Sequence, residues 1–305
     1  MWTSNTTDLL DYAYSSHSEI PRILRDFAAQ CIAAANQKAE YCYFGTGSLQ
    51  AASPVDNLVQ RINNVIGNLT TKSYTDPTTQ SSYSMYALSA AVRQSLTSPK
   101  KFPTLAQYLM DAEYIIQSRT PDNSVNEYNI LTNNTDVVID NVEETNLTIS
   151  STTWNRFDPF TGDSNTFVWP AVVCLDQNLG TNNTVDWFVD KWYNQTHTNA
   201  LVGYMSSAFS ACLAWPNLTH YDVEKVYAAD FPSKLKNKML VIGVTDDPVT
   251  PYHSALNTYN TIGADNAEFL IHDGMGHCSL QNPNPCTTNA VKAYFLNGMS
   301  VSGGA

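Results

Sequence analysis

The chain has 305 residues, of which 43% are hydrophobic and only 14% are charged. This composition supports one large domain or two smaller ones, and it excludes a disordered chain or a coiled coil. A net charge of −12 with 16 basic residues argues against a nucleic-acid partner, because phosphate binding needs clustered Lys and Arg. The sequence has no run of about 18 apolar residues, so we predict no membrane-spanning helix and no membrane partner.

Residues 8–120 are predicted to be mainly helical. Apolar residues recur at helical spacing from Ile20 to Ala35, and the Ser16-x-x-Glu19 pattern before them is typical of a capping box. Further helices are predicted over 55–67, 82–97 and 104–118. We interpret the apolar and aromatic residues of these segments as packing residues, and we expect no cofactor.

Residues 119–165 change in character, because Asn, Thr, Asp and Ser dominate them. We expect a long irregular insertion here, with a short hairpin through Val137–Ile139. Regular structure is expected to return at the apolar segment 167–174. Helices are then predicted over 184–195 and 199–213.

From residue 236 the pattern alternates between strand and helix. Met239–Gly243 is a short apolar run suited to a strand buried on both faces, and Ala267–Ile271 is a second strand. Thr250 before Pro251 predicts a helix that ends near Ile262, with Thr250 as its N-cap. Thr287 or Thr288 is expected to cap a final helix. This βαβα order implies a parallel sheet and an α/β fold.

The loops that follow the two strands carry the residues suited to catalysis. Functional groups of an open parallel sheet gather at the carboxyl ends of its strands. Asp246 and Asp247 follow the first strand, and His277 follows the second in the segment Gly274-Met275-Gly276-His277. A carboxylate that orients an imidazole is the acid–base part of a hydrolase triad, and the order acid then histidine is that of α/β-hydrolases.

Four segments carry a specific resemblance: Asp247-Pro248-Val249-Thr250-Pro251, Gly276-His277-Cys278-Ser279, Pro285-Cys286 and Tyr294-Phe295-Leu296-Asn297-Gly298. They resemble the C-terminal domain of tripeptidyl-aminopeptidase-like hydrolases, a family of α/β-hydrolases. The resemblance implies that Asp247 is the triad acid and His277 the base, with Asp246 as the alternative acid. It also implies that residues 226–305 form the C-terminal part of the α/β-hydrolase sheet and that residues 1–225 form a mainly helical cap.

The remaining histidines have simpler interpretations. His17, His197, His220 and His253 are expected to be surface or capping residues, and His272 is expected to have a structural role near the loop of His277. A metal site built from His272, Asp273 and His277 is a weaker alternative, since no third ligand lies in register with them. We therefore expect no metal.

Cysteines and glycosylation sequons favour a secreted protein. Six cysteines allow fifteen pairings, of which neighbours in sequence are the preferred hypothesis: Cys31 with Cys42, Cys174 with Cys212, and Cys278 with Cys286. A nucleophilic role for Cys278, beside His277, is the less favoured alternative to a disulfide. Seven Asn-x-Ser/Thr sequons are candidate glycosylation sites, namely Asn5, Asn68, Asn133, Asn146, Asn182, Asn194 and Asn217.

The expected nucleophile is missing from the sequence. No Gly-x-Ser-x-Gly turn occurs in it, and residues 1–5 do not begin a signal peptide. We interpret the chain as truncated at the N-terminus, with the leader and the serine encoded upstream. On this interpretation the chain alone is inactive and poorly soluble, because two parallel strands are few for a stable sheet, unless its cap forms an independent helical domain.

Three functions are compatible with these patterns. The preferred one is a secreted serine exopeptidase that releases short peptides from free N-termini, with a peptide as its substrate. An esterase of the same fold is the first alternative, because the fold does not determine the substrate. The second is a non-catalytic secreted glycoprotein that lost its nucleophile.

Overall fold

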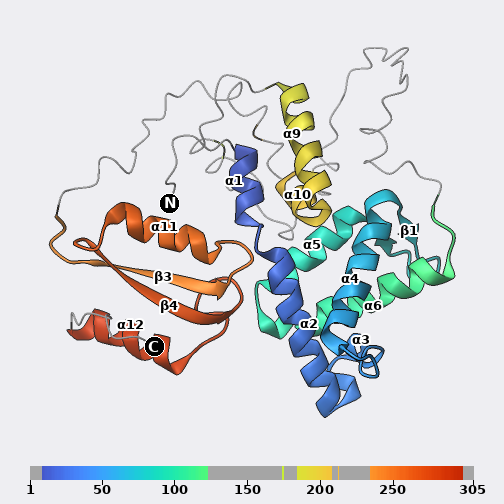
Figure 1. Ribbon diagram of the computed structural model, residues 1–305, viewed down its shortest axis with the longest axis horizontal. Coiled ribbons are helices and arrows are strands. Elements are labelled where there is room, and N and C mark those ends of the chain that lie inside the picture. Colours follow the sequence, from blue (N-terminus) through green and yellow to red (C-terminus); the bar gives the residue numbers. More distant parts are fainter. Residues whose placement is uncertain (1–8, 123–173, 175–183, 208–211, 213–233, 298–305) are drawn as a thin grey trace.

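The computed structural model describes residues 9–122, 174, 184–207, 212 and 234–297. Figure 1 shows the described elements as two groups, one of helices and the other of two parallel strands between two helices. Helices α1 and α2 lie on the side of the helical group that faces the strands (Figure 1). The two parallel strands and their flanking helices are consistent with the predicted α/β class.

The helical group follows the predicted segments closely. Its elements are α1 (Leu9–Ser16), α2 (Ile20–Gln37), η1 (Ala39–Tyr41), α3 (Tyr43–Thr46), α4 (Pro54–Thr71), α5 (Met85–Leu96), η2 (Pro99–Lys101), α6 (Phe102–Ser118), α9 (Val185–Thr198) and α10 (Ala200–Ser206). Two-residue strands β1 (Tyr74–Thr75) and β2 (Ser82–Tyr83) pair antiparallel between α4 and α5. The helices predicted from apolar spacing are therefore confirmed, with ends that differ by a few residues.

Each long helix contributes an apolar stripe to one shared core. On α4 the stripe consists of Leu58, Ile62, Val65 and Leu69, each at most 2% exposed. Side chains of α2, α5, α6, α9 and α10 complete this core. Burial of one such side chain stabilises the fold by roughly 1.5–3 kcal/mol. The expectation that these apolar residues serve packing is confirmed.

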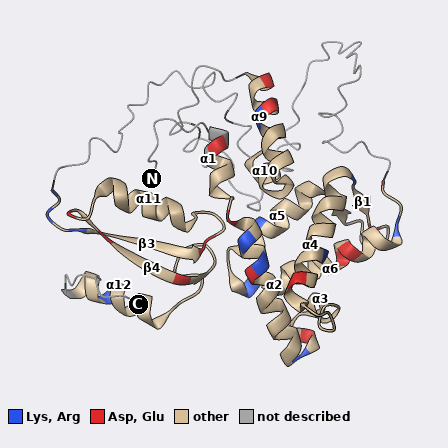
Figure 2. Ribbon diagram, in the orientation of Figure 1, with Lys and Arg blue, Asp and Glu red and all other residues tan. Residues whose placement is uncertain are grey.

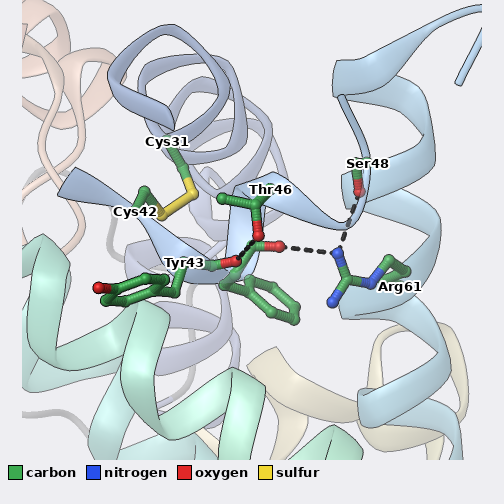
Figure 3. The surroundings of a disulfide bond; sticks show 7 residues. Cys31, Cys42, Tyr43, Thr46, Ser48 and Arg61 are labelled. Atoms are coloured by element: carbon green, nitrogen blue, oxygen red, sulfur yellow. Dashed lines mark hydrogen bonds between the residues drawn. A yellow bond between two sulfur atoms is a disulfide. The ribbon is translucent and has the colours of Figure 1, made fainter. Parts of the chain in front are cut away.

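A disulfide and a partly buried arginine hold the turn that follows α2. Cys31 and Cys42 are bonded, which ties the turn back onto the helix (Figure 3). Arg61 of α4 reaches the same turn, where its guanidinium donates to the carbonyl oxygen of Phe44 at 2.7 Å and to Ser48 Oγ at 3.1 Å. Arg61 also pairs with Glu113 of α6 through Nε at 2.8 Å, so one side chain joins three segments of the helical group.

The second group is the βαβα unit that the sequence predicts. Strands β3 (Met239–Asp246) and β4 (Ala267–Met275) pair in parallel from Met239 opposite Ala267, with a bulge between Val244 and Asp246. Helix α11 (Tyr252–Ile262) covers one face of the strands and α12 (Pro285–Asn297) lies at the other (Figure 1). Gly243 allows α11 to pack closely on the strands, since a Cβ at this position would meet Phe269, Tyr252 and Ala255 at 3.0–3.2 Å.

Three predicted helix caps are wrong, because each side chain binds another group or lies at a position other than the N-cap. The box Ser16-x-x-Glu19 does not cap α2: Ser16 is the last residue of α1, and Glu19 binds Arg22 instead. Thr250 lies one residue before Pro251, the N-cap of α11, and its hydroxyl binds Asp247. Thr287 lies inside α12, and its hydroxyl contacts the ring of His272 at 2.8 Å.

The apolar run of β3 is less buried than predicted. Met239, Leu240, Val241 and Ile242 are only partly buried, because the described sheet has two strands and no third strand covers its edge. Exposed apolar side chains also include Ile271 at 47%, Phe295 at 76% and Leu296 at 79%. This unit therefore presents apolar surface that a larger sheet of the same kind would bury.

Several predictions concern residues outside those described. The insertion at 119–165 beyond residue 122, the hairpin at Val137–Ile139, the segment 167–174 except Cys174, and the domain boundary near residue 225 all fall there. Within the described ranges, no helix has the length and apolar character needed to cross a membrane.

Candidate active site

The two loops predicted to carry catalysis lie at the same end of the sheet. Asp247 directly follows β3, and His277 lies two residues beyond the end of β4. Because the strands are parallel and Asp246 is opposite Met275, both loops leave the same carboxyl edge. The structure therefore brings the predicted acid and base together: His277 Nδ1 is 3.1 Å from Asp247 Oδ1 and 3.2 Å from Oδ2.

Asp247 is held by a dense set of donors. Its side chain is 2% exposed. Oδ1 accepts the N–H groups of Val249 and Thr250, each at 2.8 Å, and Oδ2 accepts the Thr250 hydroxyl at 2.8 Å and the Cys278 N–H at 3.0 Å. Burial raises the pKa of Asp247, but the hydrogen bonds from His277 and these backbone groups together lower it below its ordinary value. The carboxylate is thus ionised and fixed in orientation.

The ring of His277 is oriented by Asp247. The Nδ1–H points at Asp247, which leaves the Nε2 lone pair directed away from the carboxylate. The hydrogen bond to Asp247 raises the pKa of His277, burial opposes this shift, and the charge of Arg93 opposes it further, with a net rise. Its side chain is 40% exposed, and no described hydroxyl or thiol bonds Nε2. The ring is therefore oriented and accessible.

The loop between β4 and His277 is docked on the helical group. Gly276 has φ of +115°, a conformation that favours glycine. A Cβ at this position would lie 2.9 Å from the Thr97 carbonyl oxygen. The same carbonyl accepts the His277 N–H at 2.8 Å, and Gln30 of α2 donates to Met275 Sδ at 2.7 Å. Helices α2 and α5 thus hold the backbone that carries the histidine.

Asp246 does not share the role of Asp247. It forms an ion pair with Arg22 of α2, and the same guanidinium donates to the Thr245 carbonyl oxygen at 2.6 Å. Figure 2 shows basic residues of α2 gathered at the end nearest the strands. Asp246 therefore links the sheet to the helical group, whereas Asp247 faces the histidine.

The residues of the weaker metal hypothesis have separate partners. His272 is fully buried in β4 and contacts Thr287, whereas Asp273 accepts the Thr245 hydroxyl at 3.1 Å. His277 faces Asp247. Among the described residues there is no group of three or more His, Cys, Asp or Glu placed to hold a metal ion. His272 serves the packing of α12 on the sheet, in keeping with a structural role.

One other histidine differs from its predicted position. His17 was expected at the surface or as a cap, but it is 3% exposed, with Nδ1 2.8 Å from the Ala13 carbonyl oxygen. Burial lowers the pKa of His17 to about 4. His197 is exposed in the last turn of α9, His253 is partly exposed near Ser15 and Glu19, and His220 lies outside the described residues.

Two of the three predicted disulfides are present. Cys31 bonds Cys42, and Cys174 bonds Cys212. The third prediction is wrong in this structure, where Cys278 and Cys286 are free and exposed. Local hydrogen bonds hold each backbone separately: the Cys278 N–H binds Asp247, and the Cys286 N–H binds Asn284 in the first turn of α12.

Two of the seven sequons lie among the described residues. Asn68 is partly buried on α4, where its amide binds the Asn64 carbonyl oxygen at 2.8 Å, and Asn194 is exposed on α9. Glycosylation at the seven positions stays a prediction. The two disulfides are compatible with a secreted protein.

Sequence reasoning missed the residues that approach the pair from the helical group, namely Arg22, Gln30, Arg93 and Thr97. They precede Asp246 and His277 by at least 149 positions (246 − 97), and no local pattern marks them. Two open cavities of about 460 and 580 Å³ lie elsewhere, one lined by α1 and α9 and the other by β2 and α6. Neither includes Asp247 or His277, so volume alone does not locate the candidate site.

Comparison with known proteins agrees with this geometry. Residues 199–303 match the family described as TAP-like protein, an α/β-hydrolase family. Carboxylesterase B of Mycobacterium tuberculosis is 38% identical over 61 residues, as is a hydrolase of Mycobacterium bovis. The match covers 20% of this chain and 11% of each relative, so the chain spans about a tenth of the length of these relatives. These similarities support a hydrolase of the α/β-hydrolase family.

Proposed function

We propose that Asp247 and His277 are the acid and the base of a serine hydrolase that cleaves acyl bonds. The observation that carries the proposal is the contact of 3.1 Å between a buried, multiply bonded carboxylate and an accessible imidazole at the carboxyl end of a parallel sheet. The similarity of residues 199–303 to a hydrolase family supports the same assignment.

In the proposed reaction His277 moves the protons. Nε2 takes the proton of the attacking hydroxyl and later gives it to the leaving group, while Asp247 keeps Nδ1 protonated and stabilises the imidazolium. The N–H groups of Val249, Thr250 and Cys278 hold the carboxylate in place during both transfers. The attacking hydroxyl is expected on a Gly-x-Ser-x-Gly turn, which the sequence of 305 residues does not contain.

The preferred substrate is a peptide with a free N-terminus, from which a secreted exopeptidase would release short peptides. The resemblance to tripeptidyl-aminopeptidase-like hydrolases supports this choice. So does the packing of helices α2 and α5 beside the candidate site, because a helical cap would restrict access to short substrates. Two disulfides support a secreted location.

An ester is the second candidate substrate. The observation in its favour is the matching segment of a protein named carboxylesterase B. Peptide amides and esters are cleaved by the same acid–base chemistry, so Asp247 and His277 would have the same roles with either. A catalytically silent glycoprotein is the third candidate, favoured by the missing Gly-x-Ser-x-Gly turn.

The test compares the 305-residue chain with the complete reading frame that contains it. Both are assayed with a tripeptide p-nitroanilide that has a free amine, the same compound acetylated at its N-terminus, and p-nitrophenyl butyrate. Exopeptidase activity predicts cleavage of the free-amine peptide only, whereas an esterase prefers the butyrate. Cleavage of none of the three by the complete frame would favour the silent glycoprotein.

His277→Gln is the decisive variant, and His253→Gln is its control. Loss of the general base is expected to lower kcat by roughly 10²–10⁴-fold. His253 is a partly exposed histidine of α11 that does not contact Asp247, so its variant should keep full activity. Turnover that survives His277→Gln unchanged would rule out the proposed mechanism.

A further inference from the structure

Arg93 is a mostly buried cation beside the candidate site. It lies in the last turn of α5, four residues before Thr97 and thus on the same face of the chain. Thr97 is the residue whose carbonyl oxygen accepts the His277 N–H at 2.8 Å. The face of α5 that carries Arg93 is therefore the face docked on the loop of the candidate base.

Arg93 has no counterion in the described part of the chain. Arg22, Arg25 and Arg61 each pair with a carboxylate, but Arg93 makes neither an ion pair nor a hydrogen bond to any described residue. A buried guanidinium stays charged near neutral pH, and burying such a charge without a partner is unfavourable. The helical group thus retains a cation that its own side chains do not neutralise.

Two neighbouring groups indicate where this charge acts. The charge of Arg93 opposes the protonation of both His277 and His17. His17 is 3% exposed, and its Nε2 has no hydrogen-bond partner although Nδ1 binds the Ala13 carbonyl oxygen. Arg93 is therefore an unpaired cation on the face of α5 that holds the loop of His277, and its charge also acts on a buried ring that has an unpartnered nitrogen.

We propose that Arg93 recognises a carboxylate of the substrate and places it next to His277. A guanidinium binds a carboxylate through two parallel hydrogen bonds, which gives both charge and orientation. The favoured substrates are acyl compounds that also carry a carboxylate, such as short peptides with a free C-terminus or half-esters of dicarboxylic acids. This inference rests on the proposed hydrolase function, because it treats His277 as the reacting base.

The test measures binding without turnover, using the 305-residue chain and calorimetric titration at pH 7. The probes are N-acetylglycine, which has a carboxylate, and N-acetylglycinamide, its neutral analogue. Wild-type protein is expected to bind the first at least roughly tenfold more tightly than the second. Arg93→Met should abolish the difference, whereas Arg93→Lys should keep part of it because the charge remains.

Controls separate this inference from loss of fold and from failure of the proposed function. Arg93→Met should melt at or above the wild-type temperature, because an unpaired buried charge is removed. Arg25→Met, which removes an exposed arginine paired with Asp56, should keep the discrimination. His277→Gln in the 305-residue chain should still bind N-acetylglycine, whereas the same change in the complete reading frame should abolish hydrolysis. Equal binding of the two probes by wild-type protein, or unchanged discrimination in Arg93→Met, would overturn the role of Arg93.

Discussion

Replacing Asp247 with Asn should destabilise the protein far more than the same change at Asp246. Asp247 Oδ2 accepts the Thr250 hydroxyl and the Cys278 N–H, and an amide that keeps Oδ1 in place presents its NH₂ to those two donors. Each donor that loses its acceptor costs about 1–3 kcal/mol, with the lower end expected where water can reach it. Because Thr250 and Cys278 are exposed residues, we use the lower end for each of the two donors. We therefore expect Asp247→Asn to lower the free energy of unfolding by about 2 kcal/mol at pH 7.

Asp246→Asn is the matched control, because it changes the adjacent residue in the same way. Asp246 pairs with Arg22, whose side chain is 46% exposed, and such surface pairs contribute about 0–1 kcal/mol. Urea denaturation of the wild type and both variants gives the two losses directly. Equal losses for Asp246→Asn and Asp247→Asn would refute the view that Asp247 is the carboxylate on which the local structure depends.

The loss in Asp247→Asn should also depend on pH. The pKa of Asp247 is lowered in the folded protein, so its contribution is present above its ordinary value of 3.8 and disappears as the pH falls through the folded value. The pKa of His277 is raised, so the stabilisation from its protonated form is present below 6.5 and disappears as the pH rises through its folded pKa. The difference between wild type and variant is therefore expected to be largest between about pH 4 and 6.5.

Two further predictions concern backbone geometry and the disulfide. Gly276→Ala should destabilise the chain by about 1–3 kcal/mol, because φ is +115° and the new Cβ meets the Thr97 carbonyl oxygen. Gly67→Ala is the control: it adds a Cβ to open space in a helix and should stabilise the chain by about 0.5–1 kcal/mol. Thermal melts that show the reverse order would contradict this prediction. Replacing Cys31 and Cys42 together with Ser should cost about 2–3 kcal/mol in urea denaturation, since a short loop is released, and a change below about 0.5 kcal/mol would contradict that.

The contact between Asp247 and His277 could be predicted from sequence because it depends on short-range patterns. Two apolar runs separated by a helical segment predict parallel strands, and parallel strands put the residues that follow them at one edge. Asp247 and His277 each come within two residues of a strand end, so their meeting required no knowledge of distant packing. The helices were predictable for a similar reason, since their apolar spacing is local.

The helix-cap predictions failed because other groups compete with the helix backbone for the same hydroxyls. Thr250 before Pro251 has the local chemistry of an N-cap, but the carboxylate of Asp247 is a charged acceptor and takes its hydroxyl. Thr287 of α12 likewise contacts His272 of β4. Such outcomes depend on which groups tertiary packing brings near, and this also explains why Arg22, Arg93 and Thr97 were missed.

The pKa of His277, measured by NMR titration of its ring in wild-type protein and in Asp247→Asn, tests the pairing of Asp247 with His277 most directly. Because Asp247 bonds the ring at 3.1 Å and raises its pKa, we predict a value above 6.5 in the wild type and a lower value in the variant. A His277 that titrates at or below 6.5 in the wild type, and is unchanged in Asp247→Asn, would contradict the acid–base pair on which the proposed function depends.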